Sequence, residues 1–111
     1  LSKEEALINW SLPAKQIELN VRAFNPFPCA YTLLGDQRIK VWQVIALEEP
    51  TTLLPGTIAR VSTEGVDIAT STGLVRLLNV QLAGKKAMAI ADIVNGQPNL
   101  FQQQHMFASQ A

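Results

Sequence analysis

The chain has 111 residues, 48% of them hydrophobic, and its nine basic and nine acidic residues cancel at neutral pH. This length predicts a single domain with an ordinary core, which buries roughly 65% of the surface that the unfolded chain exposes. Because the net charge is zero, strong nonspecific binding to polyanions through bulk charge is not expected, and any nucleic-acid contact must come from a local patch of cations.

The single cysteine, Cys29, excludes an internal disulfide framework and a zinc cluster built from cysteines. It fits a buried apolar position in a reducing compartment. No apolar run approaches the ~20 residues of a membrane span, and the first residues show no signal-peptide core. We therefore expect a cytoplasmic protein with no membrane partner. The lack of an initial Met suggests a fragment whose neighbouring domain is missing.

Two helices are predicted in the first 25 residues. Ser2 and Glu5 have the spacing of a capping box, in which each side chain accepts a hydrogen bond from the backbone N–H of the other residue. A short helix over residues 3–8 should follow this box, and Asn9 and Trp10 should end it.

The second helix should begin at Ser11, which offers an N-cap, and it tolerates Pro13 in its first turn. Pro26 should end the helix one or two residues earlier, because a proline disfavours helical geometry in the residue before it. The run Asn-Pro-Phe-Pro at 25–28 then predicts a rigid, extended exit. Apolar residues at spacings of four and three form the buried stripe: Ile17, Val21 and Phe24.

Beyond Pro28 the apolar period changes from 3.6 to 2, which predicts strands. Most connections are short and contain glycine, as hairpin turns require, whereas residues 48–55 form a longer loop with two prolines. Five strands are predicted: 30–34, 38–47, 56–62, 66–70 and 74–82.

Alternation assigns the side chains of the two longest strands to opposite faces. In strand 38–47 one face carries Arg38, Lys40 and Trp42, and the other carries Ile39, Val41, Ile45 and Leu47. In strand 74–82 one face carries Leu74, Arg76, Leu78, Val80 and Leu82. The opposite face begins apolar and turns polar: Val75, Leu77, Asn79 and Gln81.

A short helix over residues 88–95, with Gly96 in its C′ position, is predicted after the strands. Residues 98–111 are rich in Gln and Asn and should form a loose tail, from which Leu100, Phe101 and Phe107 could dock. The fold is therefore predicted to be mainly β. We expect a small open Greek-key barrel of the oligonucleotide-binding (OB) type, with about five to six strands, an N-terminal helix and a short C-terminal helix. A single domain over 1–97 would contain the helical lead-in (1–25), the barrel (29–83) and the helix (88–95).

No catalytic site can be assembled from the sequence. His105, the single histidine, has no carboxylate or second histidine near it in the sequence. The adjacent acids Glu48 and Glu49 would point in opposite directions on a strand. The run at 84–86, Gly-Lys-Lys, lacks the upstream glycine of a phosphate-binding loop, and no metal-ligand spacing is present. Catalysis by this chain alone is not expected.

Cations beside an aromatic residue favour a binding function. Open OB barrels bind nucleic acids with cations that follow the phosphates and aromatic faces that stack on bases. Gly84 lets the backbone bend and should present the two lysines after it at the rim of the barrel. Trp42 could instead pack under the helix, and Arg22 could instead pair with Glu18. The candidate nucleic-acid-binding residues are Arg22, Arg38, Lys40, Trp42, Lys85 and Lys86.

Five short runs are specific in combination: I-x-W-S (8–11), RAFNP-x-P (22–28), KVW (40–42), PGTI (55–58) and AGKKAM (83–88). With the residues around them, which span nearly the whole chain, they resemble the C-terminal domain of bacterial methionyl-tRNA formyltransferase. The chain departs from this pattern at Phe27, where the family often has Trp, and at Asn9, where it often has Asp.

The resemblance implies an OB-like domain that helps to position initiator methionyl-tRNA for formylation. In that family a separate N-terminal domain binds 10-formyltetrahydrofolate and carries the catalytic residues, so no cofactor or catalytic residue is assigned here. Lys40, Lys85 and Lys86 lie in matching runs and are expected to form a basic surface facing the tRNA. The expected partners are the initiator tRNA and the N-terminal catalytic domain of the same polypeptide.

Two other functions remain open. The C-terminal domain of a nucleotide-sugar formyltransferase shares the I-x-W-S and Pro-x-Pro features and need not touch RNA. A purely structural domain would instead pack on its catalytic neighbour through Trp10, Phe24 and Phe27.

Overall fold

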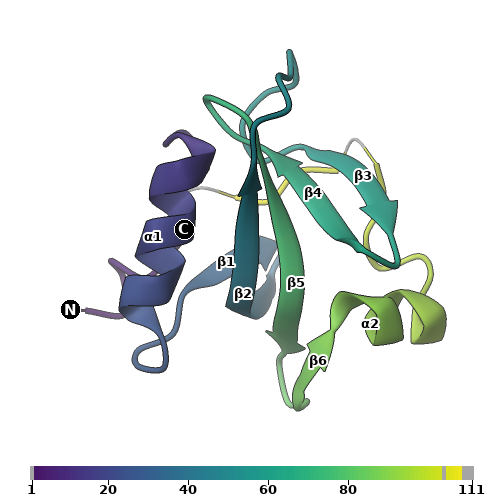
Figure 1. The fold of residues 1–111 in the computed structure, drawn as a ribbon. Helices are drawn as coiled ribbons and strands as arrows, with labels where there is room; N and C mark the ends of the chain where they lie inside the picture. Colours follow the sequence, from purple (N-terminus) through teal and green to yellow (C-terminus); the bar gives the residue numbers. More distant parts are fainter. Residues whose placement is uncertain (1, 104, 109–111) are drawn as a thin grey trace.

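The computed structural model describes residues 2–103 and 105–108 and confirms a mainly β fold (Figure 1). The helices are α1 (Ala14–Phe24) and α2 (Ile90–Gly96). The strands are β1 (Tyr31–Leu34), β2 (Gln37–Leu47), β3 (Ile58–Ser62), β4 (Gly65–Ala69), β5 (Leu74–Leu82) and β6 (Ala87–Ala89). In the part of the chain that the structure describes, no helix has the length and apolar character needed to cross a membrane.

Strand β5 is the centre of one antiparallel open sheet of six strands, in the order β1-β2-β5-β4-β3 with β6 paired to β5. One edge of β5 pairs with β2 over residues 74–82. The other edge pairs first with β4, at residues 74–77, and then with β6, at residues 79–81. The observed bounds of β5 equal the predicted ones, because its pattern ends where the turn at Ala83 and Gly84 begins.

Residues 105–108 link the two edge strands of this sheet, β1 and β3. The N–H of Ile58 donates to the carbonyl of His105 at 2.8 Å, and the N–H of Ala108 donates to the carbonyl of Leu33 at 2.9 Å. The backbone groups of an open sheet edge need partners, and this segment supplies some of them. The predicted docking of Phe101 and Phe107 is confirmed, since both are buried. Residues 104 and 109–111 of the predicted tail lie outside the described residues.

Helix α1 lies beside β2 (Figure 1) and buries the predicted stripe through Ile17 and Val21. Its C-cap is Asn25, which is extended before Pro26, as predicted. Ser11 is not the N-cap. Pro13 holds that position without a side-chain cap, and the N–H of Ala14 donates to the carbonyl of Thr72 at 3.0 Å. The loop before β5 therefore supplies the acceptor that we expected from a local side chain.

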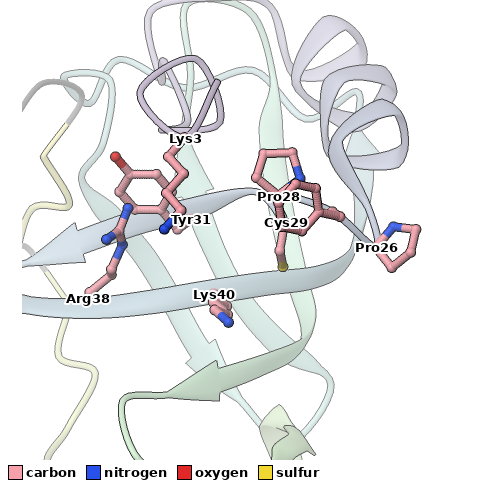
Figure 2. Close-up of a pocket in the computed structure, with 8 residues that line it drawn as sticks. Lys3, Pro26, Pro28, Cys29, Tyr31, Arg38 and Lys40 are labelled. Atoms are coloured by element: carbon pink, nitrogen blue, oxygen red, sulfur yellow. The ribbon is translucent and has the colours of Figure 1, made fainter. Parts of the chain in front are cut away.

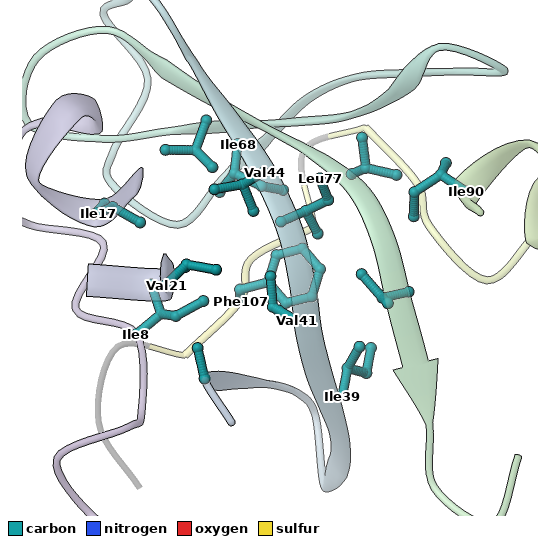
Figure 3. Close-up of a cluster of buried hydrophobic side chains, with 14 of the residues drawn as sticks. Ile8, Ile17, Val21, Ile39, Val41, Val44, Ile68, Leu77, Ile90 and Phe107 are labelled. Carbon is teal, nitrogen blue, oxygen red and sulfur yellow. The ribbon is translucent and has the colours of Figure 1, made fainter. Parts of the chain in front are cut away.

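Three aromatic rings lie in the hydrophobic core: Trp10, Phe101 and Phe107. Trp10 is fully buried, and its indole N–H donates to the hydroxyl of Thr32 at 3.1 Å. The ring of Phe107 lies 5.9 Å from that of Trp10 and 6.2 Å from that of Phe101, between centroids. Figure 3 shows Phe107 among aliphatic side chains from α1, β2 and β5. Each large side chain buried here contributes about 1.5–3 kcal/mol.

The predicted helix over residues 3–8 is absent, although its capping box forms. The N–H of Ser2 donates to Oε1 of Glu5, and the N–H of Glu5 donates to Oγ of Ser2, both at 3.2 Å. The chain then makes a turn and pairs with Tyr31, whose carbonyl and N–H bond to Ile8 and Ala6 at 2.8 and 3.0 Å. Pairing with β1 therefore replaces the helical hydrogen bonds of these residues.

Residues 25–28 form a turn rather than the predicted extended exit. The peptide bonds that precede Pro26 and Pro28 are both cis. The N–H of Cys29 donates to the carbonyl of Phe24 at 2.9 Å and closes the turn. Cys29 is buried, as predicted, and has a positive φ of 77°.

A β-bulge in β2 overturns part of the predicted face assignment. Before the bulge Ile39 and Val41 are buried, as predicted. The pairing with β5 then shifts on either side of Gln43, so Val44 becomes buried and Ile45 is 38% exposed. Alternation counts residues and cannot register an inserted one. The phase of β5 shifts too, so its core side chains are Val75, Leu77, Val80 and Leu82.

The C-terminal helix begins later than predicted. Residues 87–89 form β6, so α2 starts at Ile90. Gly96 is the last helical residue rather than the C′ residue, and the N–H of Gln97 donates to the carbonyl of Ile93 at 2.7 Å.

Candidate nucleic-acid interface

The basic residues of the chain fall into a paired group and an unpaired group. Four of the nine form salt bridges within 4 Å: Lys15, Arg22, Arg60 and Arg76. The other five have no salt bridge to a carboxylate in residues 2–103 and 105–108: Lys3, Arg38, Lys40, Lys85 and Lys86. We call these five residues the cationic face. Lys3, Arg38 and Lys40 line one pocket, and Arg38 and Lys40 also line a second one that ends at Gly84, directly before Lys85 and Lys86 in the chain.

The first pocket, of about 260 Å³, is lined by Lys3, Arg38 and Lys40 together with Tyr31 and residues 26–29. Figure 2 shows Lys3, Tyr31 and Arg38 along one side of it and the two prolines on the other. The second pocket, of about 170 Å³, shares Arg38 and Lys40 and continues to residues 81–84. Neither lining includes an Asp or Glu. An anion would therefore meet cations here without a competing carboxylate in the wall.

The register of the sheet places these cations. Lys40 pairs with Tyr31 on one side and with Gln81 on the other, so the side chains of all three lie on one face. The guanidinium of Arg38 lies over the ring of Tyr31, 3.7 Å from its centroid. Such stacking on an aromatic face orients the guanidinium while leaving its N–H groups available to an acceptor.

Hydrogen bonds connect Trp42 to residues 83–86, the loop between β5 and β6, which we call the lysine loop. The indole N–H of Trp42 donates to Oε1 of Gln81 at 2.9 Å, and Nε2 of Gln81 donates to the carbonyl of Lys85 at 2.8 Å. The N–H of Lys85 in turn donates to the carbonyl of Leu82 at 3.0 Å. Gly84, with a φ of +74° and open space around it, allows this tight turn. The lysine loop is thus fixed to the same part of the sheet as Lys40.

Trp42 and Arg22 share a pocket with Glu18 and Val21, between α1 and β2. Trp42 is therefore half-buried beside the helix rather than open on a free face. The predicted pair between Arg22 and Glu18 is confirmed at 3.2 Å. Glu18 also accepts hydrogen bonds from Lys15 and from the N–H of Ala46, and these bonds lower the pKa of its carboxyl below the ordinary value. Arg22 lies next to Trp42 but is paired with Glu18, a carboxylate that it shares with Lys15.

Asn25 attaches the 25–28 turn to the sheet. Its Nδ2 lies 2.8 Å from the carbonyl of Val21 and 3.2 and 3.3 Å from the carbonyls of Val41 and Trp42. One side chain thereby joins the end of α1 to the bulge of β2. Beside it, burial raises the pKa of the Cys29 thiol, although nearby Lys40 acts in the opposite direction. The thiol is therefore neutral at physiological pH.

A second group of charges lies on strands β3, β4 and β5 and forms a closed network. Asp67, 1% exposed, accepts hydrogen bonds from Nε of Arg60 and Nε of Arg76, both at 2.7 Å. Arg60 also bonds to Glu49, and Arg76 to Glu64. The bonds to Glu49 and then Asp67 raise the pKa of Arg60, and those to Asp67 raise the pKa of Arg76. These arginines are occupied within the fold.

The structure brings five of the six predicted site residues to one region. The sixth, Arg22, lies outside the cationic face. Arg38, Lys40, Lys85 and Lys86 belong to the cationic face, and Trp42 adjoins it through Gln81. Arg22 lies on the helix, paired with Glu18. Four further residues of this region were not predicted from the sequence as binding residues: Lys3, Phe27, Tyr31 and Gln81. Of these four, only Phe27 stands out in the sequence, as an aromatic residue between two prolines.

No group of three or more potential metal ligands occurs among the described residues.

The chain is thus a mainly β domain with a leading helix, and it carries a cationic face. A model of the family described as "Formyl transferase, C-terminal domain" matches residues 1–98, and the chain belongs to this family. Two crystal structures of HypX from Aquifex aeolicus share the fold, one of them in complex with tetrahydrofolic acid and one of a variant with several substitutions. Their TM-scores are 0.71 and 0.70 at 17% identity, over 93% of this chain and 19% of the HypX chain. The chain thus spans about a fifth of the length of HypX.

Proposed function

We propose that this chain is the C-terminal domain of a methionyl-tRNA formyltransferase and that its cationic face binds the initiator methionyl-tRNA. A separate N-terminal domain of the same cytoplasmic polypeptide would bind 10-formyltetrahydrofolate and transfer its formyl group to the methionyl amine. In this proposal the present domain holds no cofactor and supplies no catalytic residue. Its contribution is to raise the affinity for the RNA and to orient it.

The observation that carries the proposal is the segregation of charge. Every arginine and lysine outside the cationic face is bonded to a carboxylate, whereas the five cations of the face are not bonded to any described one. Unpaired cations gathered at one end of a protein with zero net charge are suited to phosphates at a local contact. The runs at 22–28 and 83–88, which resemble the tRNA enzyme, contribute the turn and the lysine loop of this region.

Replacing both Lys85 and Lys86 with Ala in the full-length enzyme is expected to raise the KM for initiator tRNA about tenfold or more at ~0.1 M salt. The slope of log K against log salt should fall by about 1.4 to 1.8, since each lost phosphate contact removes about 0.7 to 0.9. The value of kcat at saturating tRNA should not change. Steady-state kinetics and filter binding measure these quantities.

Lys15→Ala is the matched control, because Lys15 is exposed, is paired with Glu18 and lines a different pocket near Leu47 and Glu48. It should leave the KM and the salt slope unchanged. If the lysine pair has no effect on either quantity, the RNA contact of the face is refuted. A loss of stability without a change in KM would instead support the purely structural domain. For that alternative Trp10 is not available, because it is fully buried.

A further inference from the structure

The first pocket combines cations with the most exposed large apolar side chain in the described part of the chain. Phe27 is 78% exposed and lines the pocket of about 260 Å³ that contains Lys3, Arg38 and Lys40. Figure 2 shows the cationic side of this pocket facing the side formed by Pro26 and Pro28. An exposed aromatic side chain therefore stands at the entrance of a cation-lined hollow.

The turn that carries Phe27 is well supported although its tip is exposed. Pro26 and Pro28 fix the backbone φ on both sides of Phe27. Asn25 and Cys29 attach the two ends of the turn to β2 and to α1 through the hydrogen bonds described above. Phe27 is therefore presented at low cost in conformational entropy, which is the property that favours binding by a preorganised group.

The chemistry of this pocket matches a single nucleotide. Aromatic rings stack on nucleobases whatever the base, because every base has a π-face, and guanidinium groups bind phosphates through paired N–H donors. The volume is just below the range of about 300–1,000 Å³ typical of whole small-molecule sites. It accommodates the phosphate and sugar of one nucleotide, with the base outside on Phe27.

We propose that Phe27, Arg38 and Lys40 form a subsite for one unstacked nucleotide of the bound RNA. The base stacks on Phe27, and its phosphate lies between the Arg38 guanidinium and the Lys40 ammonium. This subsite rests on the proposed function, since it assigns to one part of the cationic face the recognition of a single-stranded element. Lys85 and Lys86, at the other side of the cationic face, contact phosphates only.

A titration of the ¹⁵N-labelled 111-residue chain with the trinucleotide ApApA tests the subsite by NMR. We expect backbone N–H shifts at Phe27, Cys29, Arg38 and Lys40, and upfield shifts of the adenine protons from the ring current of Phe27. Phe27→Leu keeps an apolar side chain without a stacking face and should weaken binding roughly 5- to 150-fold. Phe27→Trp should bind at least as tightly, and Leu54→Ala, at another exposed apolar residue, should not matter.

The outcomes separate this subsite from the proposed function. Absence of ApApA binding, or equal binding by Phe27→Leu and the unchanged chain, overturns the subsite. If the full-length enzyme with Lys85 and Lys86 replaced by Ala, the lysine-pair variant, still loses affinity for tRNA, the RNA-binding function stands without the subsite. A third outcome refutes both proposals. In it, neither Phe27→Leu nor the lysine-pair variant changes the affinity for ApApA or for tRNA, and Phe27→Leu lowers the melting temperature of the full-length enzyme because Phe27 packs on the catalytic domain.

Discussion

Asp67→Asn is expected to destabilise the domain by about 3–5 kcal/mol, the range for removing one partner of a buried ion pair. Asp67 lies in β4 and is 1% exposed. It pairs with Arg60 of β3 on one side and with Arg76 of β5 on the other. It accepts one hydrogen bond from Arg60 and two from Arg76, the latter at 2.7 and 3.1 Å. An amide of equal size would remove the charge that holds the two guanidinium groups together. Urea denaturation measures the loss.

Glu49→Gln is the control for this prediction, because it removes the outermost carboxylate of the same network. Glu49 is half exposed and bonds only to Arg60, so its replacement should cost less than about 1 kcal/mol. We expect the two variants to differ clearly in their loss of stability. A loss below 1 kcal/mol for Asp67→Asn would show that water or a rearranged arginine compensates the missing charge.

The triple variant Lys40→Glu, Lys85→Glu, Lys86→Glu is expected to weaken binding of the full-length enzyme to initiator tRNA by about two orders of magnitude at ~0.1 M salt. Three lost contacts should remove about 2.1 to 2.7 from the salt slope, and the new carboxylates add repulsion to the loss. All three lysines are exposed, so the melting temperature should stay nearly constant. Filter binding from low to high salt gives both the affinity and the slope.

Lys15→Glu compares the same charge change at the other end of the chain's longest strand. Lys15 lies near Leu47, at the C-terminal end of β2, whereas Lys40 lies near its N-terminal end. The single variant Lys40→Glu should therefore weaken binding and Lys15→Glu should not. Equal losses for the two would mean that overall charge, rather than the cationic face, determines the affinity.

The sequence predicted the helices and strands of this fold better than the distant segments with which they pair. Strand β5 and the end of α1 were predicted correctly because a glycine turn and Pro26 mark them locally. The helix over 3–8 was wrong because Tyr31, far along the chain, competes for the same backbone groups. The faces of Ile45 and the start of β5 were wrong because the bulge near Gln43 inserts a residue into the alternation.

The candidate site shows the same division between local and long-range information. Arg38 and Lys40 could be predicted to share a face from spacing alone, and Gly84 indicated that the lysine loop would be exposed. That Gln81 lies beside Lys40 depends on the register of β2 and β5, which local patterns do not determine. The Asp67 network could not be predicted for the same reason, since its three central charges come from three separate strands.

The most direct test of the central claim is an NMR map of where initiator tRNA contacts this domain. With the ¹⁵N-labelled chain and increasing tRNA, we predict that shifts and line broadening concentrate at residues 38–42 and 81–87 and at Lys3. The N–H signals of the opposite end, residues 46–49 and 70–73, should remain unchanged. Perturbations that centre on that opposite end, or that spread evenly over the surface, would contradict a cationic face that binds RNA.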